Sequence, residues 1–199
     1  MDSAFKEILK LAEGPIRTAA IAQWVQSLYA EDEAPVLVGG GAVELYTGGA
    51  YTTGDMDFVG HVPARARKIL TRAGFVRLGK NWIHEEMKIF LEFPSSSLGK
   101  NERKAVLTVG RFRVLIVGPE DLLVDRLNAW KHWESPVDGV NSFLLYRAQC
   151  DFMDEEHLGK RALAEDVLDA LASVKTLFQN CQSGLPADEV LEKWAIKVR

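Results

Sequence analysis

Cysteines and long hydrophobic runs are scarce in this chain of 199 residues. The two cysteines, Cys150 and Cys181, have neither metal-ligand nor redox spacing, which disfavours a structural zinc site. Two isolated cysteines are typical of a reducing compartment, so we expect a cytoplasmic protein. No apolar run approaches the roughly 18–20 residues of a membrane-spanning helix, and the acidic N-terminus is unlike a signal peptide. A membrane is therefore not among the expected partners.

Charge is unevenly distributed along the chain, although the net charge is only −4. Residues 1–60 carry 3 Lys and Arg against 9 Asp and Glu, and residues 114–199 carry 9 against 15. Residues 61–113 carry 12 against 4, which gives this central segment a net charge of +8. A basic segment beside carboxylates suits a metal-bound polyphosphate or a nucleic acid. The alternative is that these basic side chains form a solvated surface.

Hydrophobic periodicity changes character near residue 118. Before it, the pattern alternates between helices and short strands, and after it only helical spacing remains. We therefore expect an α/β domain over residues 1–118 and a helical C-terminal region over 119–199, where Trp130 and Trp133 would belong to the core. The expected helices cover 3–12, 15–30, 63–73, 119–130, 137–150, 160–179 and 187–197, and the expected strands cover 36–38, 55–59, 75–78, 82–84, 87–93, 105–109 and 112–117.

The most informative stretch is PVLVGGGAVELYTGGAYTTGDMDFVG, residues 35–60. A short apolar strand leads into Gly39, Gly40 and Gly41, which we expect to form a turn before a helix. A second strand carries Asp55 and Asp57, whose side chains project from one face because successive side chains alternate. Two adjacent carboxylates repel each other, and a divalent cation would relieve that repulsion.

Two common nucleotide-binding motifs do not account for this stretch. A P-loop is excluded because Gly41 is followed by Ala-Val instead of Lys-Ser/Thr. A dinucleotide-binding motif is disfavoured because Glu44 stands where a third glycine belongs, and because the strands do not keep alternating with helices.

A third carboxylate, Glu92, lies near the end of the expected strand 87–93. Ile89, Leu91 and Phe93 alternate onto one face of that strand, which leaves Glu92 on the other. Glu92 is either a functional acid or an edge-strand residue that reaches water.

The order Gly-Gly, Asp-x-Asp and a later acid resembles the nucleotidyltransferase superfamily. The segments VGGGAVELY, TTGDMDF and GPEDLLVDRLNAWKHW resemble a bacterial nucleotidyltransferase-like group related to abortive-infection toxins, over roughly residues 35–150. The resemblance implies a small mixed sheet flanked by helices and followed by a helical region, with a cleft between them that holds the nucleotide.

The resemblance also implies a chemistry. Asp55, Asp57 and Glu92 would be catalytic and would bind two Mg²⁺ ions, which hold a nucleoside triphosphate while an acceptor hydroxyl attacks its α-phosphate. The nucleotide-binding residues would be Gly39, Gly40, Gly41, Thr53 and Arg126. The acceptor would be RNA, a protein or a small molecule, and the toxin relatives imply a cognate antitoxin as a further partner.

Two positions depart from the pattern of the superfamily. Gly41 stands where relatives have Ser or Thr, and Tyr51 stands where relatives commonly have Arg. Both departures remove groups that hold phosphates. The alternative function is therefore a catalytically degenerate module of the same fold, which binds a nucleotide or a partner.

Overall fold

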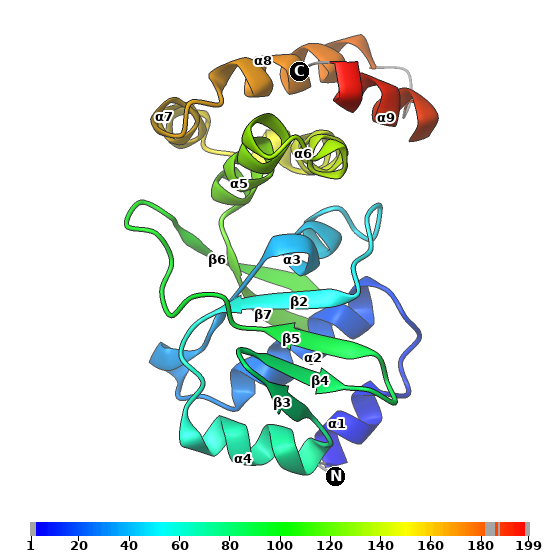
Figure 1. The fold of residues 1–199 in the computed structure, drawn as a ribbon, viewed down its shortest axis with the longest axis vertical. Helices are drawn as coiled ribbons and strands as arrows, with labels where there is room; N and C mark the ends of the chain where they lie inside the picture. Colours follow the sequence, from blue (N-terminus) through cyan, green and yellow to red (C-terminus); the bar gives the residue numbers. More distant parts are fainter. Residues whose placement is uncertain (1–2, 182–185, 187, 198–199) are drawn as a thin grey trace. The chain divides into compact units, whose positions relative to one another are not determined.

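The computed structural model describes residues 3–181, 186 and 188–197 (Figure 1). The chain forms two compact units, Met1–Gly118 and Pro119–Arg199. The first unit combines helices with a mixed sheet, and the second consists of helices in its described residues. The predicted α/β class is confirmed.

Seven strands of the first unit form one sheet in the order β3-β4-β5-β2-β1-β7-β6. At its centre, β1 runs antiparallel to β2 and parallel to β7, while β2 runs parallel to β5. The outer pairs, β3-β4, β4-β5 and β6-β7, are antiparallel. The strands are β1 (Val36–Val38), β2 (Asp55–Val59), β3 (Val76–Leu78), β4 (Asn81–His84), β5 (Ile89–Glu92), β6 (Lys104–Val109) and β7 (Phe112–Val117).

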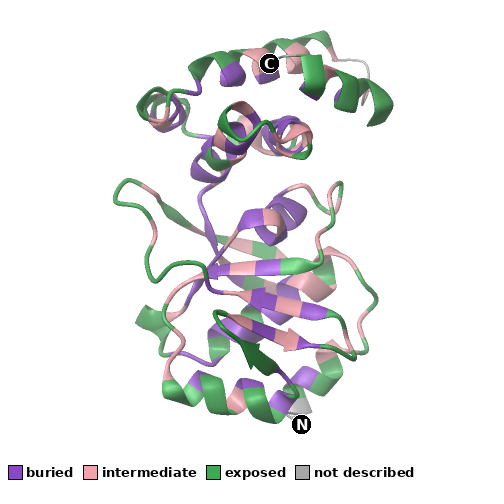
Figure 2. Cartoon of the chain, viewed as in Figure 1, coloured by how far each residue is buried: buried purple, intermediate pink, exposed green. Residues whose placement is uncertain are grey.

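Buried residues alternate with less buried ones along the central strands (Figure 2), so one face of the sheet is buried more completely than the other. Leu37 on β1 lies opposite Phe58 on β2, and Met56 lies opposite Leu91 on β5. All four side chains are buried. The residues that alternate with Met56 and Phe58 on β2 include Asp55, which is exposed, and Asp57, which is half-buried. This alternation follows from the pleat of a strand.

Helices of the first unit cover the buried face. Helix α2 packs against β7 and runs behind the sheet in Figure 1, and α3 packs against β2. Phe5 of α1 lies against Trp24 of α2, with ring centroids 4.4 Å apart. The helical segments of this unit are α1 (Ser3–Ile8), α2 (Pro15–Ser27), the short 3₁₀ segment η1 (Glu31–Glu33), α3 (Gly39–Tyr46) and α4 (Ala64–Ala73).

The glycines at 39–41 do not form the expected turn. Strand β1 passes directly into α3, and the three glycines are the first turn of that helix. Gly39 makes the change of direction with φ of 62°, in the left-handed region that glycine adopts readily.

The second unit consists of packed helices in the described part of the chain. Trp130 of α5 is buried against Trp194 of α9, with ring centroids 4.7 Å apart, so it belongs to the core as predicted. The same prediction is wrong for Trp133, which is 79% exposed. Its helical segments are α5 (Pro119–His132), α6 (Pro136–Gln149), the 3₁₀ segment η2 (Cys150–Phe152), α7 (Glu155–Ala164), α8 (Leu168–Asn180) and α9 (Asp188–Lys197).

The expected helix 160–179 is wrong, because its residues belong to two helices. Helix α7 ends at Ala164 and α8 begins at Leu168. Asp166, between them, has φ of 56°, a left-handed backbone conformation that interrupts the right-handed helical path. Among the described residues, no helix is both long and apolar enough to cross a membrane.

Candidate functional site

The two aspartates of β2 lie on the same side of the sheet, as the sequence predicts. Asp55 begins the strand and is exposed, and Asp57 follows two residues later. Met56 between them is buried on the opposite face. The alternation of a strand therefore presents two carboxylates together, next to a strand terminus that solvent reaches.

Strand pairing places Glu92 beside this pair. Strands β2 and β5 run parallel with Asp57 directly opposite Glu92, so both side chains leave the same face of the sheet. On its other side, Glu92 lies opposite Asn81 of β4, whose side-chain nitrogen donates to Glu92 Oε1 at 2.9 Å. Glu92 is thus placed between the aspartates and an amide donor.

Gly39 makes room for the carboxylate of Asp57. A Cβ atom added at Gly39 would lie 2.1 Å from Asp57 Oδ2, a distance at which atoms overlap. The two residues come together because Val38, just before Gly39, pairs with Asp57 across β1 and β2. The glycine is therefore required both by its φ and by the neighbouring carboxylate.

The next two glycines have different surroundings. A Cβ at Gly40 would lie 3.0 Å from Thr53 Oγ1, so Thr53 packs closely against the first turn of α3. The Thr53 hydroxyl oxygen also accepts from the backbone N–H of Asp55 at 3.3 Å. A Cβ at Gly41 would meet only ordinary contacts, with Leu37 Cδ1 nearest at 3.4 Å. Steric need thus accounts for Gly39, the space at Gly40 is tight, and Gly41 has room for a side chain.

The start of α3 is suited to negative charge. Val38, at the N-cap position, makes no side-chain hydrogen bond to this helix, and the first three residues of the helix are glycines. A helix N-terminus carries a partial positive charge and favours anions. The carboxylate of Asp57 lies at this N-terminus, against Gly39. A phosphate approaching the same N–H groups would meet that carboxylate, and a cation between them would remove the repulsion.

We call the face of the sheet that carries Asp55, Asp57 and Glu92 the acid face. Its three candidate ligands are all carboxylates, which suit a hard cation such as Mg²⁺. The strand register puts Asp57 and Glu92 side by side, with Asp55 on the same face. Within the described ranges, however, no three His, Cys, Asp or Glu side chains form a group that could hold a metal ion. Glu92 instead has Asn81 as a partner of its Oε1.

Arg126, the last predicted nucleotide-binding residue, belongs to α5 of the helical unit. Its guanidinium pairs with Asp125 and, at 2.8 Å, with Asp138 of α6. Burial of its side chain lowers the pKa of Arg126, but the two carboxylates together outweigh that effect, and the pKa is raised. The predicted role of Arg126 in nucleotide binding stays a prediction.

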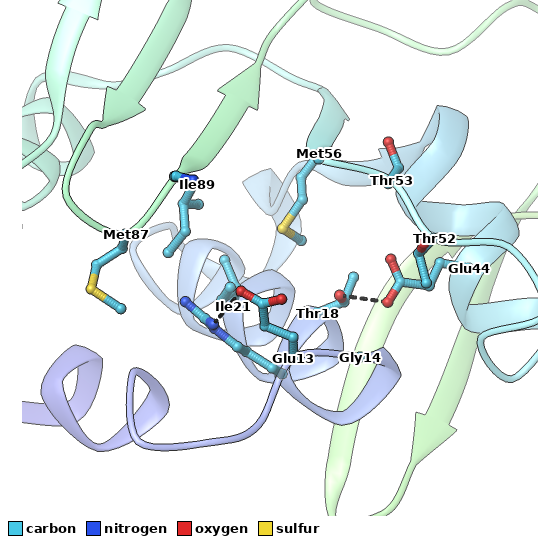
Figure 3. Close-up of a pocket in the computed structure, with 13 residues that line it drawn as sticks. Glu13, Gly14, Thr18, Ile21, Glu44, Thr52, Thr53, Met56, Met87 and Ile89 are labelled. Carbon is cyan, nitrogen blue, oxygen red and sulfur yellow. Dashed lines mark hydrogen bonds and ion pairs between the residues drawn. The ribbon is translucent and has the colours of Figure 1, made fainter.

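A pocket of about 520 Å³ lies beside residues 52–54, the loop that precedes β2 (Figure 3). We call it the loop pocket. Met56 lines it, so it lies on the face of the sheet opposite Asp55 and Asp57. Four ionisable side chains line the loop pocket, and these are Glu13, Arg17, Glu44 and Lys88.

Glu44 is the buried carboxylate of the loop pocket, with an exposed fraction of 2%. The Thr18 hydroxyl donates to its Oε1 at 2.9 Å (Figure 3). Burial raises the pKa of Glu44, and hydrogen bonds from Thr18 and the Thr53 backbone partly offset that effect. Glu44 was not among the predicted site residues, although an acid in the otherwise apolar segment AVELY is the signal of a buried polar site.

Arg17 is a second residue of the loop pocket that was not among the predicted site residues. Its side chain is 11% exposed, and a guanidinium nitrogen lies 3.6 Å from Glu13 Oε1. Its Nε atom is buried and has no hydrogen-bond partner among the residues that the structure describes. The sequence signal that could have marked it is an arginine in the first turn of the otherwise apolar helix PIRTAAIAQWV.

Comparisons with known proteins return no relative: no family model, curated protein or solved structure matches this chain.

Proposed function

We propose that this protein is a Mg²⁺-dependent nucleotidyltransferase, which transfers a nucleoside monophosphate from a nucleoside triphosphate to a hydroxyl group. The proposal extends the resemblance of its Gly-Gly and Asp-x-Asp segments to the nucleotidyltransferase superfamily. One observation carries it. Asp57 lies against Gly39 at the start of α3 and opposite Glu92 on β5, so three separate motifs meet at one residue.

The contribution of each residue follows from its chemistry. Backbone N–H groups of Gly39, Gly40 and Gly41 attract the phosphates of the triphosphate at the positive end of α3. Asp55, Asp57 and Glu92 would hold the Mg²⁺ ions, which neutralise charge on the attacking and leaving oxygens when bound. The acceptor oxygen forms a bond to the α-phosphorus while the bond to the pyrophosphate oxygen breaks. Glu92 accepts the hydroxyl proton of the acceptor.

The transfer is tested by incubating the protein with Mg²⁺, an extract of bacterial cells and triphosphates that carry a radioactive phosphorus. Nucleotidyl transfer moves the α-phosphorus to the acceptor and releases the γ-phosphorus in pyrophosphate. We therefore expect a labelled RNA, protein or small molecule from α-labelled triphosphate and none from γ-labelled triphosphate. Digestion with ribonuclease or protease then identifies the class of acceptor.

Matched variants test whether labelling depends on the carboxylates of the acid face or on the charge of the protein in general. Asp57→Asn and Glu92→Gln are expected to reduce labelling at least a hundredfold, because each removes a proposed metal ligand. Glu31→Gln removes an exposed carboxylate from η1 of the same unit and should leave labelling unchanged. Equal labelling by all three variants would contradict the proposal.

A specific observation also favours a second candidate, a non-catalytic module that binds a nucleotide or a partner protein such as an antitoxin. Glu92 already has a partner in Asn81, and the described residues contain no group of three metal-ligating side chains. This candidate predicts that triphosphate binds without any transfer of α-label. Binding together with transfer would exclude it.

A further inference from the structure

Beyond the acid face, the first unit contains a hollow of about 490 Å³ that is lined by cationic side chains. We call it the basic hollow. Arg67 of α4, Arg77 of β3, and Lys80 of the turn between β3 and β4 line it together with His61. No Asp or Glu is among its lining residues in the described part of the chain.

The basic hollow is built at the ends of two parallel strands. The residues that follow β2, from Gly60, and those that follow β5, up to Ser96, form adjoining parts of its wall. The backbone N–H of Gly60 donates to the Ser95 carbonyl at 3.0 Å and holds the two segments together. Because β2 and β5 also carry the acid face, the two features share the same strands.

Backbone carbonyls hold the three cations in place. Arg67 Nε donates to the Val62 carbonyl at 2.9 Å, and Lys80 Nζ donates to the Pro94 carbonyl at 3.2 Å. Arg77 Nε donates to the Gly79 carbonyl at 3.0 Å. A guanidinium has five N–H donors and an ammonium has three, so each cation keeps donors for a ligand.

The positive charge of the basic hollow is not neutralised within the chain. Among the described residues, none of the three cations forms an ion pair with a carboxylate. The neighbouring hollow, which shares Gly60 and His61, contains Asp32 and Glu33 and limits the positive area on that side. The uncompensated positive charge is therefore confined to the basic hollow, where it favours the binding of an anion.

The aromatic residues of the basic hollow do not offer a surface for stacking bases. Trp82 is 4% exposed and Phe93 is 7% exposed, so both rings are buried. Recognition must then act on phosphate groups, which bind arginine and lysine irrespective of sequence. The backbone of a single strand can bend to bring successive phosphates onto three cations that are grouped in one hollow, whereas the phosphates of a duplex are held on a stiff helix.

We infer that the basic hollow binds the phosphate backbone of a single-stranded nucleic acid, with Arg67, Arg77 and Lys80 each contacting a phosphate. Three contacts on a single strand predict that log K falls with log salt concentration at a slope of about −2. Affinity for the strand then falls about twentyfold between 50 and 200 mM salt. Because this inference concerns binding alone, it does not rest on transfer activity.

The experiment measures fluorescence anisotropy of a labelled 12-nucleotide uridine strand with the full-length protein, without Mg²⁺ or triphosphate. Arg67→Gln, Arg77→Gln and Lys80→Gln are each expected to reduce the salt effect from about twentyfold to about sevenfold. Arg72→Gln removes the same charge from α4 outside the basic hollow and should retain the twentyfold effect. Arg77→Lys keeps the charge and should bind like the unchanged protein, which separates loss of charge from loss of folding.

Three outcomes would overturn the inference. In the first, the Gln variants keep the full salt effect, or Arg72→Gln reduces it equally. In the second, inorganic phosphate displaces the strand when its concentration equals the concentration of phosphate groups in the strand. That result would mean that the basic hollow binds a free anion. In the third, a 12-base-pair duplex binds more tightly than the single strand. Binding of the strand without transfer of label would disprove only the proposed function.

Discussion

The absent side chain of Gly39 leaves the space that Asp57 occupies, and substitution tests this directly. Gly39→Ala is expected to lower the free energy of unfolding by about 1–2 kcal/mol, because a residue with a Cβ is strained at the positive φ of this position. Displacing Asp57 should cost about 1–3 kcal/mol more. Gly48→Ala is the matched control, because Gly48 has the same φ of 62° but no atom within 4 Å of an added Cβ. Equal losses in urea unfolding of the two variants would contradict the close approach of Asp57.

Gly41 has room for a side chain, so its substitution should have the opposite effect. Gly41→Ala is expected to raise the free energy of unfolding by about 0.5–1 kcal/mol, because alanine is the better helix former. Gly41→Ser adds a hydroxyl in the first turn of α3, where the proposed function places the triphosphate. One extra hydrogen bond of about 1 kcal/mol should tighten triphosphate binding about fivefold relative to Gly41→Ala. Destabilisation by Gly41→Ala would show that the site is more crowded than described.

The buried Glu44 predicts a dependence of stability on pH. Because burial raises the pKa of Glu44 in the folded state, the unfolded chain releases this proton first as the pH rises. Ionisation of Glu44 then costs stability between the ordinary glutamate pKa and the raised one. Glu44→Gln keeps an acceptor for Thr18 but has no proton to lose. The variant should therefore gain stability over the unchanged protein as the pH rises from about 4.

The measurement is the free energy of unfolding of both proteins in urea between pH 4 and pH 8. The difference between them should be small at pH 4 and larger at pH 8. A constant difference over this range would mean that the Glu44 carboxyl is not desolvated.

The sequence could predict which carboxylates share a face, because that depends only on alternation along a strand. It places Asp55 with Asp57 and sets Glu92 apart from Ile89 and Leu91. It could not predict that Asp57 lies opposite Glu92, because register between strands depends on contacts far apart in the chain. The loop pocket, with Arg17 and Glu44, was missed for the same reason.

The division between α7 and α8 shows the limit of periodicity at the level of a whole helix. Apolar residues continue at helical spacing across the division, but Asp166 takes a left-handed conformation. The Lys131 ammonium donates to the Asp166 carbonyl and, at 2.9 Å, to Asp169. These contacts come from α5, so residues 160–179 alone do not contain the signal.

Asp166→Gly should stabilise the protein, because glycine adopts positive φ without steric cost. The expected gain in the free energy of unfolding is about 0.5–1 kcal/mol. The Asp166 side chain is 89% exposed, so loss of its contact with Lys131 matters little. Asp166→Ala removes the same carboxylate but keeps a Cβ, and it should not stabilise. A thermal melt compares the two, and a gain from both would assign the effect to charge instead of backbone conformation.

The basic and acidic segments of the whole chain can be assigned to its two units. The basic segment 61–113 lies entirely within the unit that carries the acid face. The second unit holds its own polar network, in which buried Asp121 accepts from Arg161 at 2.8 Å and contacts His157. The change from mixed elements to helices was visible in the sequence because composition and period both change there. The order of strands in the sheet was not, because pairing joins distant segments.

The central claim, a metal-dependent triphosphate site at Asp55 and Asp57, is tested most directly by isothermal titration calorimetry. Each of the four ribonucleoside triphosphates is titrated into the full-length protein with Mg²⁺ and again with a chelator. We expect at least one triphosphate to bind with Mg²⁺, to bind at least tenfold more weakly without it, and to lose that difference in the Asp55→Ala/Asp57→Ala variant. Absence of binding by all four with Mg²⁺, or equal binding by the variant, would contradict the account.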